Sequence, residues 1–222
     1  MGEALPIFPL ATVLFPGVSL PLHIFEERYR HLVGDLLQRP EGTARTFGVV
    51  AIREGYEVGT RGVQSVQRLG CAAQMTSARR YDDGRYDIEV VGRRRLRVDA
   101  VDTSGDYLVG EVEWLQETRG ADAPREAARA WQAFEAYRTR LAGLRGRAVV
   151  EGPPDRDPVR LSYQLASTCL LTQPDRQRLL EVDDAAERLR LITSLLRTEL
   201  RSMTAVPSFP ATEVARTGWS PN

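Results

Sequence analysis

The sequence predicts an α+β protein, in which a small, strongly bent antiparallel β-barrel with one helix is followed by a helical subdomain of about four helices. Two patterns predict this class. Up to residue 114, short apolar runs are separated by turn signals, which is typical of an antiparallel sheet. From residue 124 onward, apolar residues instead recur every three to four positions, which indicates amphipathic helices.

The change of pattern divides the chain into four parts. We expect the β-barrel subdomain in residues 1–116 and the helical subdomain in residues 124–202. Residues 117–123 have the composition of a linker. Residues 203–222 contain three prolines and little periodicity, so we expect a flexible C-terminal tail.

The first 25 residues predict two short apolar strands. Their prolines suit edge strands, because proline lacks the N–H that a central strand would donate. Pro16-Gly17 marks the turn between the two strands. A helix is expected over residues 26–39, because its apolar residues fall on one face. That face consists of Tyr29, Leu32, Val33, Leu36 and Leu37.

Four further strands are expected in the first subdomain. The longest should be bent or bulged near Gly70. Asp83-Gly84 predicts a type I′ hairpin turn, and apolar residues alternate with acidic ones after it, as in a half-buried strand. The expected strands cover residues 47–52, 63–81, 86–100 and 108–114.

Four helices are expected in the second subdomain. The first has an aromatic-rich apolar face between residues 127 and 144. Asp157 and Pro158 are placed to cap and begin the second, and Thr172 opens a capping box for the third. The last helix should face Ala185, Leu189, Ile192, Leu196 and Met203 inward, and Glu187, Arg188, Arg190 and Arg197 outward.

The charged residues exclude several classes of chemistry. Thirty basic and thirty acidic residues cancel, so no overall field attracts nucleic acid or an anionic membrane. All thirty basic residues are arginine. Without lysine, these residues cannot form a phosphate-binding P-loop, a Schiff base or a Ser-Lys dyad, and arginine keeps its proton and cannot act as a base.

The sequence favours a cytoplasmic protein. Cys71 and Cys169 are far apart and form no Cys-x-x-Cys pair, so we expect two buried thiols in a reducing compartment. No run approaches the roughly eighteen apolar residues of a membrane span, and the N-terminus lacks a signal-peptide pattern. We therefore expect no membrane partner.

Several motifs, in the same order along the chain, resemble the N-terminal substrate-binding domain of Lon proteases. The proline-punctuated opening is similar to the start of that domain, and Gly92-Arg93-Arg94-Arg95-Leu96-Arg97 resembles its strand with a basic end. The resemblance extends over about residues 5–202. The matching segments are residues 5–30, 47–50, 92–97, 107–113 and 179–189.

This resemblance carries several expectations. It implies a PUA-like β-barrel (pseudouridine-synthase-and-archaeosine-transglycosylase type) followed by a helical subdomain. It also implies a stand-alone, non-catalytic member of the peptidase S16 Lon-like family, because the sequence ends where full-length Lon continues into its ATPase and protease parts. Unfolded or client polypeptides would be its partners, and a separate protease is a further candidate partner.

No residue set predicts catalysis or metal binding. His23 and His31 are the two histidines, and no Gly-x-Ser-x-Gly nucleophile turn accompanies them. Together with Cys71 and Cys169 they lack the clustered spacing of metal ligands. We expect no catalytic residue, no metal and no cofactor.

The one local basic patch consists of Arg93, Arg94, Arg95 and Arg97. On a PUA-like barrel such a patch indicates contacts with RNA phosphates. An alternating strand with Leu96 inward and Arg95 and Arg97 outward explains the same run without a ligand. We favour this structural interpretation, because no series of aromatic residues for base stacking accompanies the arginines.

The loop between the first two strands contains the candidate polypeptide-binding residues Val13, Leu14, Phe15 and Pro16. A proline-rich apolar edge could pair with or cover an extended peptide. The same side chains could instead pack as core against the first helix or the helical subdomain. The sequence leaves both interpretations open.

The leading hypothesis is a non-enzymatic module that recognises polypeptides by reversible burial of apolar side chains, at the barrel edge or in a cleft between barrel and helices. An RNA-binding PUA-like module is the first alternative. A small-ligand-binding protein with its cleft between the two subdomains is the second.

Overall fold

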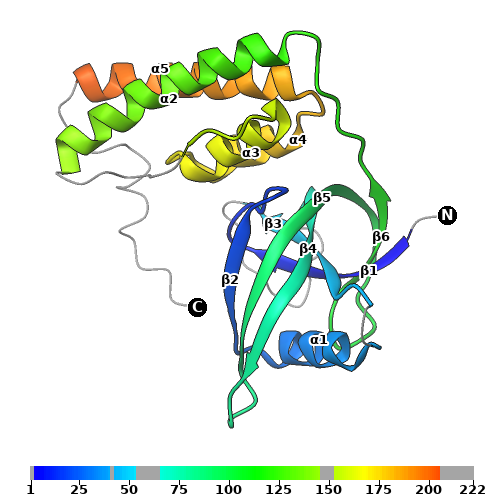
Figure 1. The fold of residues 1–222 in the computed structure, drawn as a ribbon. Coiled ribbons are helices and arrows are strands. Elements are labelled where there is room, and N and C mark those ends of the chain that lie inside the picture. Colours follow the sequence, from blue (N-terminus) through cyan, green and yellow to red (C-terminus); the bar gives the residue numbers. More distant parts are fainter. Residues whose placement is uncertain (1–2, 41–42, 54–65, 146–152, 206–222) are drawn as a thin grey trace. The chain divides into compact units, whose positions relative to one another are not determined.

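The computed structural model describes residues 3–40, 43–53, 66–145 and 153–205. The chain divides into two compact units, Met1–Gln116 and Glu117–Asn222. The first contains a sheet and one helix, and the second is helical (Figure 1). No helix in the described residues is long and apolar enough to cross a lipid bilayer.

A mixed sheet of six strands forms most of the first unit. The predicted α+β class is confirmed. The strands are β1 (Glu3–Leu10), β2 (Ser19–Ile24), β3 (Thr46–Ile52), β4 (Val66–Arg80), β5 (Tyr86–Asp102) and β6 (Val109–Trp114). Their order is β2-β5-β4-β3-β1-β6, and β6 also pairs with β5.

One strand pairing corrects the prediction of an antiparallel sheet. β1 and β3 pair in parallel, whereas the other pairings are antiparallel. Parallel neighbours require a crossover of a dozen or more residues. The chain supplies it with β2 and the helix α1 (Glu27–Gln38), which lie between β1 and β3 in sequence.

The predicted apolar face of α1 forms part of the core of the first unit. Tyr29, Leu32, Val33 and Leu36 are buried, and the ring of Tyr29 stacks on Phe8 of β1 with centroids 4.0 Å apart. The same cluster contains side chains of β2, β3, β4 and β5. Burial of this face fixes α1 against the sheet, since each fully buried aliphatic or aromatic side chain contributes about 1.5–3 kcal/mol.

β4 and β5 form a long hairpin (Figure 1). Its turn lies where Asp83-Gly84 predicts it, but the turn is not of type I′. Type I′ requires positive φ at both central residues, whereas only Gly84 has one, at 85°, in this turn. The irregularity predicted near Gly70 is confirmed, because the β3–β4 register shifts between Val50 and Ile52, opposite Gly70 and Val66.

The second unit contains α2 (Ala123–Arg145), α3 (Pro158–Thr168), α4 (Gln173–Glu181) and α5 (Ala185–Ala205). The predicted caps are confirmed: the Asp157 side chain accepts from the Val159 N–H, and Thr172 accepts from the Asp175 N–H. α2 and α5 lie side by side and run in the same direction (Figure 1). Near their ends, Arg140 Nη2 donates to the Met203 carbonyl at 2.9 Å.

Backbone hydrogen bonds join the segment before α2 to the start of α5. The Thr118 N–H donates to the Asp183 carbonyl at 3.0 Å, and the Ala185 N–H donates back to the Thr118 carbonyl at 2.9 Å. The expected linker, residues 117–123, is therefore hydrogen-bonded through Thr118 to the start of α5, and its last residue, Ala123, begins α2. Residues 206–222, most of the expected tail, lie outside the described residues.

A buried arginine joins several parts of the second unit. Arg188 of α5, predicted to face outward, is 0% exposed. Its guanidinium donates to Glu117 Oε1 at 2.8 Å, Ser162 Oγ at 2.9 Å and the Leu179 carbonyl at 3.0 Å. It also lies 4.1 Å from the ring centroid of Tyr163. The prediction from helical periodicity is wrong for Arg188, because a guanidinium can be buried where carboxylate, hydroxyl and carbonyl acceptors surround it.

Candidate functional site

The loop with the candidate residues 13–16 is largely buried. Phe15 is 0% exposed, Val13 and Leu14 are also buried, and Pro16 is half-buried. Leu14 belongs to the core cluster of the first unit. Val13, Leu14 and Phe15 thus belong to the core, which is the second of the two interpretations that the sequence leaves open.

Hydrogen bonds to β5 hold the same loop in place. The Gly17 N–H donates to the Gly92 carbonyl at 2.8 Å, and the Gly92 N–H donates to the Val18 carbonyl at 2.9 Å. A Cβ atom at position 92 would overlap the carbonyl of Phe15. Glycine is thus required where β5 passes the loop, directly before the arginine run.

Arg95 occupies a different place from the one its sequence position predicts. The side chain is 1% exposed, and Nη2 donates to the Gln116 carbonyl at 2.6 Å. A β-bulge lies directly before Arg95: Ala73 pairs with Gly92 and Cys71 with Arg95, so β5 has one more residue than β4 over this stretch. Beyond the bulge, Arg95 pairs with Cys71 and Leu96 with Gly70, so their side chains point to opposite faces of β5. Both are buried, so both faces of the strand are covered here.

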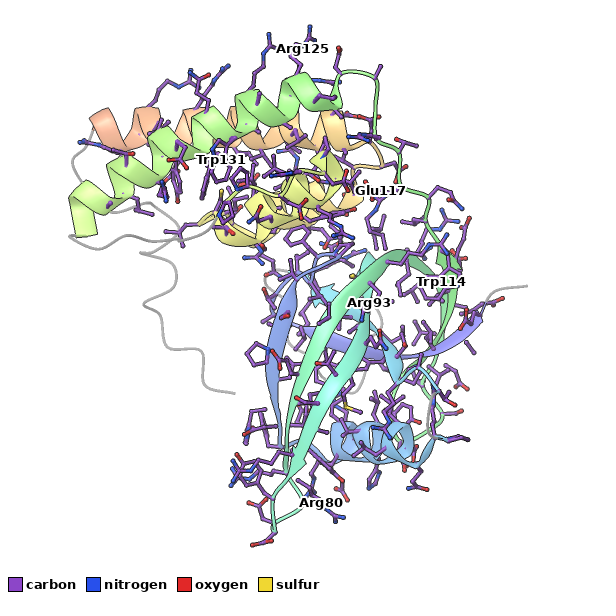
Figure 2. The ribbon with its side chains drawn as sticks, viewed as in Figure 1. Arg80, Arg93, Trp114, Glu117, Arg125 and Trp131 are labelled. Carbon is purple, nitrogen blue, oxygen red and sulfur yellow. The ribbon has the colours of Figure 1, made fainter. Side chains whose placement is uncertain are left out.

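The exposed arginines of the run have partners on neighbouring strands. Arg93 Nε donates to Gln74 Oε1 at 2.6 Å, and Arg94 Nε donates to the Leu115 carbonyl at 3.3 Å. Arg97 forms an ion pair with Asp99 at 3.0 Å and a second one with Glu113. Figure 2 labels Arg93 on β5 and Trp114 on β6, whose ring lies 5.6 Å from the guanidinium carbon of Arg94. The run is therefore a set of cross-strand contacts.

The two histidines form separate surface pairs. His23 Nδ1 lies 2.6 Å from Asp87 Oδ1, and His31 Nδ1 lies 3.0 Å from Asp106 Oδ2. The hydroxyl of Tyr81 also donates to Asp87, and this bond, followed by the one to His23, lowers the pKa of the Asp87 carboxyl. No group of three or more His, Cys, Asp or Glu residues in the described part of the chain is arranged to hold a metal.

Both thiols are buried and poorly suited to nucleophilic chemistry. Burial raises the pKa of Cys71 and of Cys169 to about 12. The thiolate is the nucleophilic form, so these cysteines are almost entirely in the unreactive form at neutral pH.

An exposed apolar surface lies at the outer edge of the sheet. Among the described strands, β2 pairs with β5 alone, so its other edge is unpaired there. Leu20 and Leu22 are half-buried and pack against the core cluster, whereas Phe25 directly after the strand is 42% exposed. Phe25 is the one exposed large hydrophobic side chain of the described residues. We call Phe25, together with the unpaired edge of β2 beside it, the β2 edge surface. Sequence reasoning missed it, because Phe25 reads as part of the apolar strand.

A second open surface is a groove of about 580 Å³ between α2 and α5. α2 contributes Glu126 and Arg129, and α5 contributes Arg190, Arg197, Arg201 and two hydroxyl side chains. We call it the arginine groove. The sequence contains a signal for it, since the three α5 arginines are spaced by seven and four residues and so share one helix face.

Comparison with known proteins identifies similar sequences over most of the chain. Residues 4–198 match the family described as the ATP-dependent protease La (LON) substrate-binding domain. Lon protease 2 of Syntrophobacter fumaroxidans is 28% identical over 212 residues, which cover 91% of this chain and 25% of that protein. Lon protease of Escherichia coli K12 is 23% identical over 199 residues, which cover 88% of this chain and 25% of that protein. The chain thus spans about a quarter of the length of these relatives.

Solved structures show the same fold. The Lon N-terminal domain protein of Xanthomonas campestris is 25% identical, with a TM-score of 0.60 over 86% of this chain and 98% of that one. The N-terminal domain of Mycobacterium avium complex Lon protease is 18% identical, with a TM-score of 0.65 over 88% of this chain and 98% of that one.

Proposed function

Because the chain belongs to the family of Lon substrate-binding domains, we propose that it is a non-enzymatic module that recognises unfolded or partner polypeptides in protein quality control. A separate protease that degrades the bound polypeptide is part of this proposal. The family supports a role in substrate recognition, and the β2 edge surface suggests where recognition takes place.

The exposure of Phe25 beside an unpaired strand edge is the observation that carries the proposal. An unfolded chain offers apolar side chains and unpaired backbone groups, and an edge strand with a neighbouring apolar side chain can engage both. Phe25 stacks on the His23 ring, with centroids 6.2 Å apart, so its position is partly fixed before a ligand arrives. A partly fixed side chain loses less conformational entropy on binding.

Pro21 limits how a client strand can pair with this edge. Proline has no N–H, so the edge of β2 lacks one donor in the middle of the strand. Edge strands with proline resist continuous pairing with other strands, which also protects them from aggregation. We therefore assign most of the binding free energy to apolar contacts with Phe25, and a smaller part to backbone hydrogen bonds.

RNA binding at the arginine run of β5 is less favoured. Arg95 is buried, and Arg97 is paired with two carboxylates, so phosphate contacts would have to break existing interactions. An RNA-binding strand surface would also present aromatic side chains for stacking.

Fluorescence anisotropy with a dye-labelled neutral peptide of about fifteen residues, rich in leucine and valine and free of acidic residues, tests the proposal. We expect binding that Phe25→Asp weakens at least tenfold and Phe25→Leu largely preserves. Ser77→Asp, an equal charge change at an exposed position of β4, is the matched control and should bind as the wild type does. Circular dichroism checks that each variant is folded. Absence of wild-type binding, or equal binding by Phe25→Asp, would refute the proposed site.

A further inference from the structure

The arginine groove concentrates positive charge on a chain whose formal net charge is zero. Arg190, Arg197 and Arg201 follow one another along one face of α5. At a rise of about 1.5 Å per residue, Arg190 and Arg197 are about 10 Å apart along the helix, and Arg197 and Arg201 about 6 Å. The groove therefore presents a line of guanidinium groups about 16 Å long.

The carboxylate in the groove does not neutralise this line. Glu126 is 3% exposed and accepts from Arg129 on its own helix at 3.1 Å. It also lies 3.4 Å from Arg125, which extends away from the start of α2 (Figure 2). The negative charge of Glu126 is thus matched by arginines of α2.

The three groove arginines of α5 have no carboxylate partner among the described residues. Arg190 and Arg197 make no hydrogen bond or ion pair with another described residue, and Arg201 donates to the neutral Thr198 hydroxyl at 3.1 Å. Free guanidinium groups bind carboxylates through two parallel hydrogen bonds, which are stronger than neutral ones.

We propose that the arginine groove binds an acidic segment of another polypeptide. This inference goes beyond the proposed function, because the groove lies in the other unit and selects by charge, whereas the β2 edge surface selects apolar chains. Successive side chains of an extended segment point to opposite sides, and residues two apart are separated by about 6.6 Å on the same side. An acidic residue at every second position therefore presents a row of carboxylates along Arg190, Arg197 and Arg201.

The groove lining favours a polypeptide over a nucleic acid. None of the described residues that line it is aromatic, so they offer no platform for base stacking. Thr193 and Ser194 add hydroxyl groups, which can donate to carboxylate oxygens.

The test measures anisotropy of a dye-labelled ten-residue peptide that has glutamates at the proposed spacing and serine or glycine elsewhere. The double variant Arg190→Glu with Arg197→Glu should weaken binding at least tenfold, and raising the salt from about 50 to 300 mM should weaken wild-type binding through screening. Arg160→Glu with Arg178→Glu, an equal charge change at exposed positions of α3 and α4, is the matched control. This control variant should change the affinity for the acidic peptide by less than threefold.

Further measurements separate the alternatives. Phe25→Asp should bind the acidic peptide as the wild type does, so failure of the β2 edge surface and failure of the groove are distinguishable. Arg190→Gln with Arg197→Gln should also lose binding, which covers the case in which the charge-reversed protein misfolds. Equal losses in the control pair, equal binding of a glutamine version of the peptide, or tighter groove-dependent binding of a ten-nucleotide single-stranded RNA would each overturn the proposal.

Discussion

Two arginine-rich segments, one in each unit, differ in what surrounds their guanidinium groups. On β5 the arginines are nearly consecutive, and Arg93, Arg94 and Arg97 each contact a neighbouring strand or a residue close in sequence. On α5 the exposed arginines are seven and four residues apart, and Arg190 and Arg197 have no partner among the described residues. The consecutive arginines of the sheet thus pair with neighbouring groups, whereas the widely spaced arginines of α5 share one helix face and stay open to a ligand.

The difference follows from the geometry of the two elements. Successive residues of a strand point to opposite faces and lie close to the side chains and backbone of both neighbours. Residues three, four or seven apart on a helix share a face, and their neighbours on that face are other residues of the same stripe. Spacing along a helix is therefore a better guide to an open charged surface than the number of consecutive arginines.

Arg188→Met would test the buried arginine of α5 and should produce the largest effect. It removes hydrogen bonds to Glu117, Ser162 and the Leu179 carbonyl, so we expect the free energy of unfolding to fall by about 3 kcal/mol. Equilibrium urea unfolding measures it. Arg190→Met, two residues away and exposed, should change stability by less than about 0.5 kcal/mol. Equal effects would mean that burial does not distinguish the arginines of α5.

Gly92→Ala would test how closely β5 approaches the loop before its arginine run. The new Cβ would overlap the carbonyl of Phe15, so we expect a loss of about 2–3 kcal/mol in urea unfolding. Gly34→Ala is the matched control, because a Cβ at position 34 of α1 would have no atom within 4 Å. In a helix that change should stabilise by about 0.5–1 kcal/mol. A neutral Gly92→Ala would show that the loop can move away from β5.

Thiol labelling would compare opening of the two units directly. With pKa values of about 12, native Cys71 and Cys169 should resist a thiol reagent at pH 8, where only about one thiol in ten thousand is ionised, and both should react in urea. Labelling should accelerate as the pH rises. Arg188→Met should accelerate labelling of Cys169, which directly follows α3, but leave Cys71 of β4 protected. Mass spectrometry of the peptides would show which cysteine is labelled. Equal acceleration would indicate that the two units open together.

Arg97→Gln should have the smallest effect. Its ion pairs with Asp99 and Glu113 are about half exposed, and such pairs contribute little because water and salt screen them. We expect an unchanged urea midpoint. A clear shift would mean that the arginine run of β5 stabilises the sheet through its charges.

Local patterns in the sequence predicted most of the fold. Turn signals, alternation and caps located the strands and helices, including the Asp157 and Thr172 caps and the buried face of α1. The parallel pairing of β1 with β3 was not predictable in this way, because strand direction depends on long-range topology. Arg95 and Arg188 were placed wrongly for related reasons: both faces of β5 are covered at Arg95, and distant acceptors compensate the burial of Arg188.

The functional surfaces were harder to predict than the fold. Residues 13–16 and Phe25 are similarly apolar, and only the tertiary structure buries Phe15 and exposes Phe25. The arginine groove requires knowledge that α2 lies beside α5, which no local pattern contains. Sequence therefore indicated the class of ligand through the family resemblance, whereas the location of each surface depends on packing.

The hydrogen bonds of Glu117 and Thr118 have a consequence for how this unit can be combined with other proteins. Helical structure begins at Ala123, but the acceptor for Arg188 lies in residues 117–122. A gene fusion that joined the helices from Ala123 onward to another domain would leave a guanidinium buried without its carboxylate. A recombination breakpoint before Glu117 keeps the ion pair of Glu117 with Arg188 intact. The segment that has to be transferred as one piece is therefore longer than the helices alone.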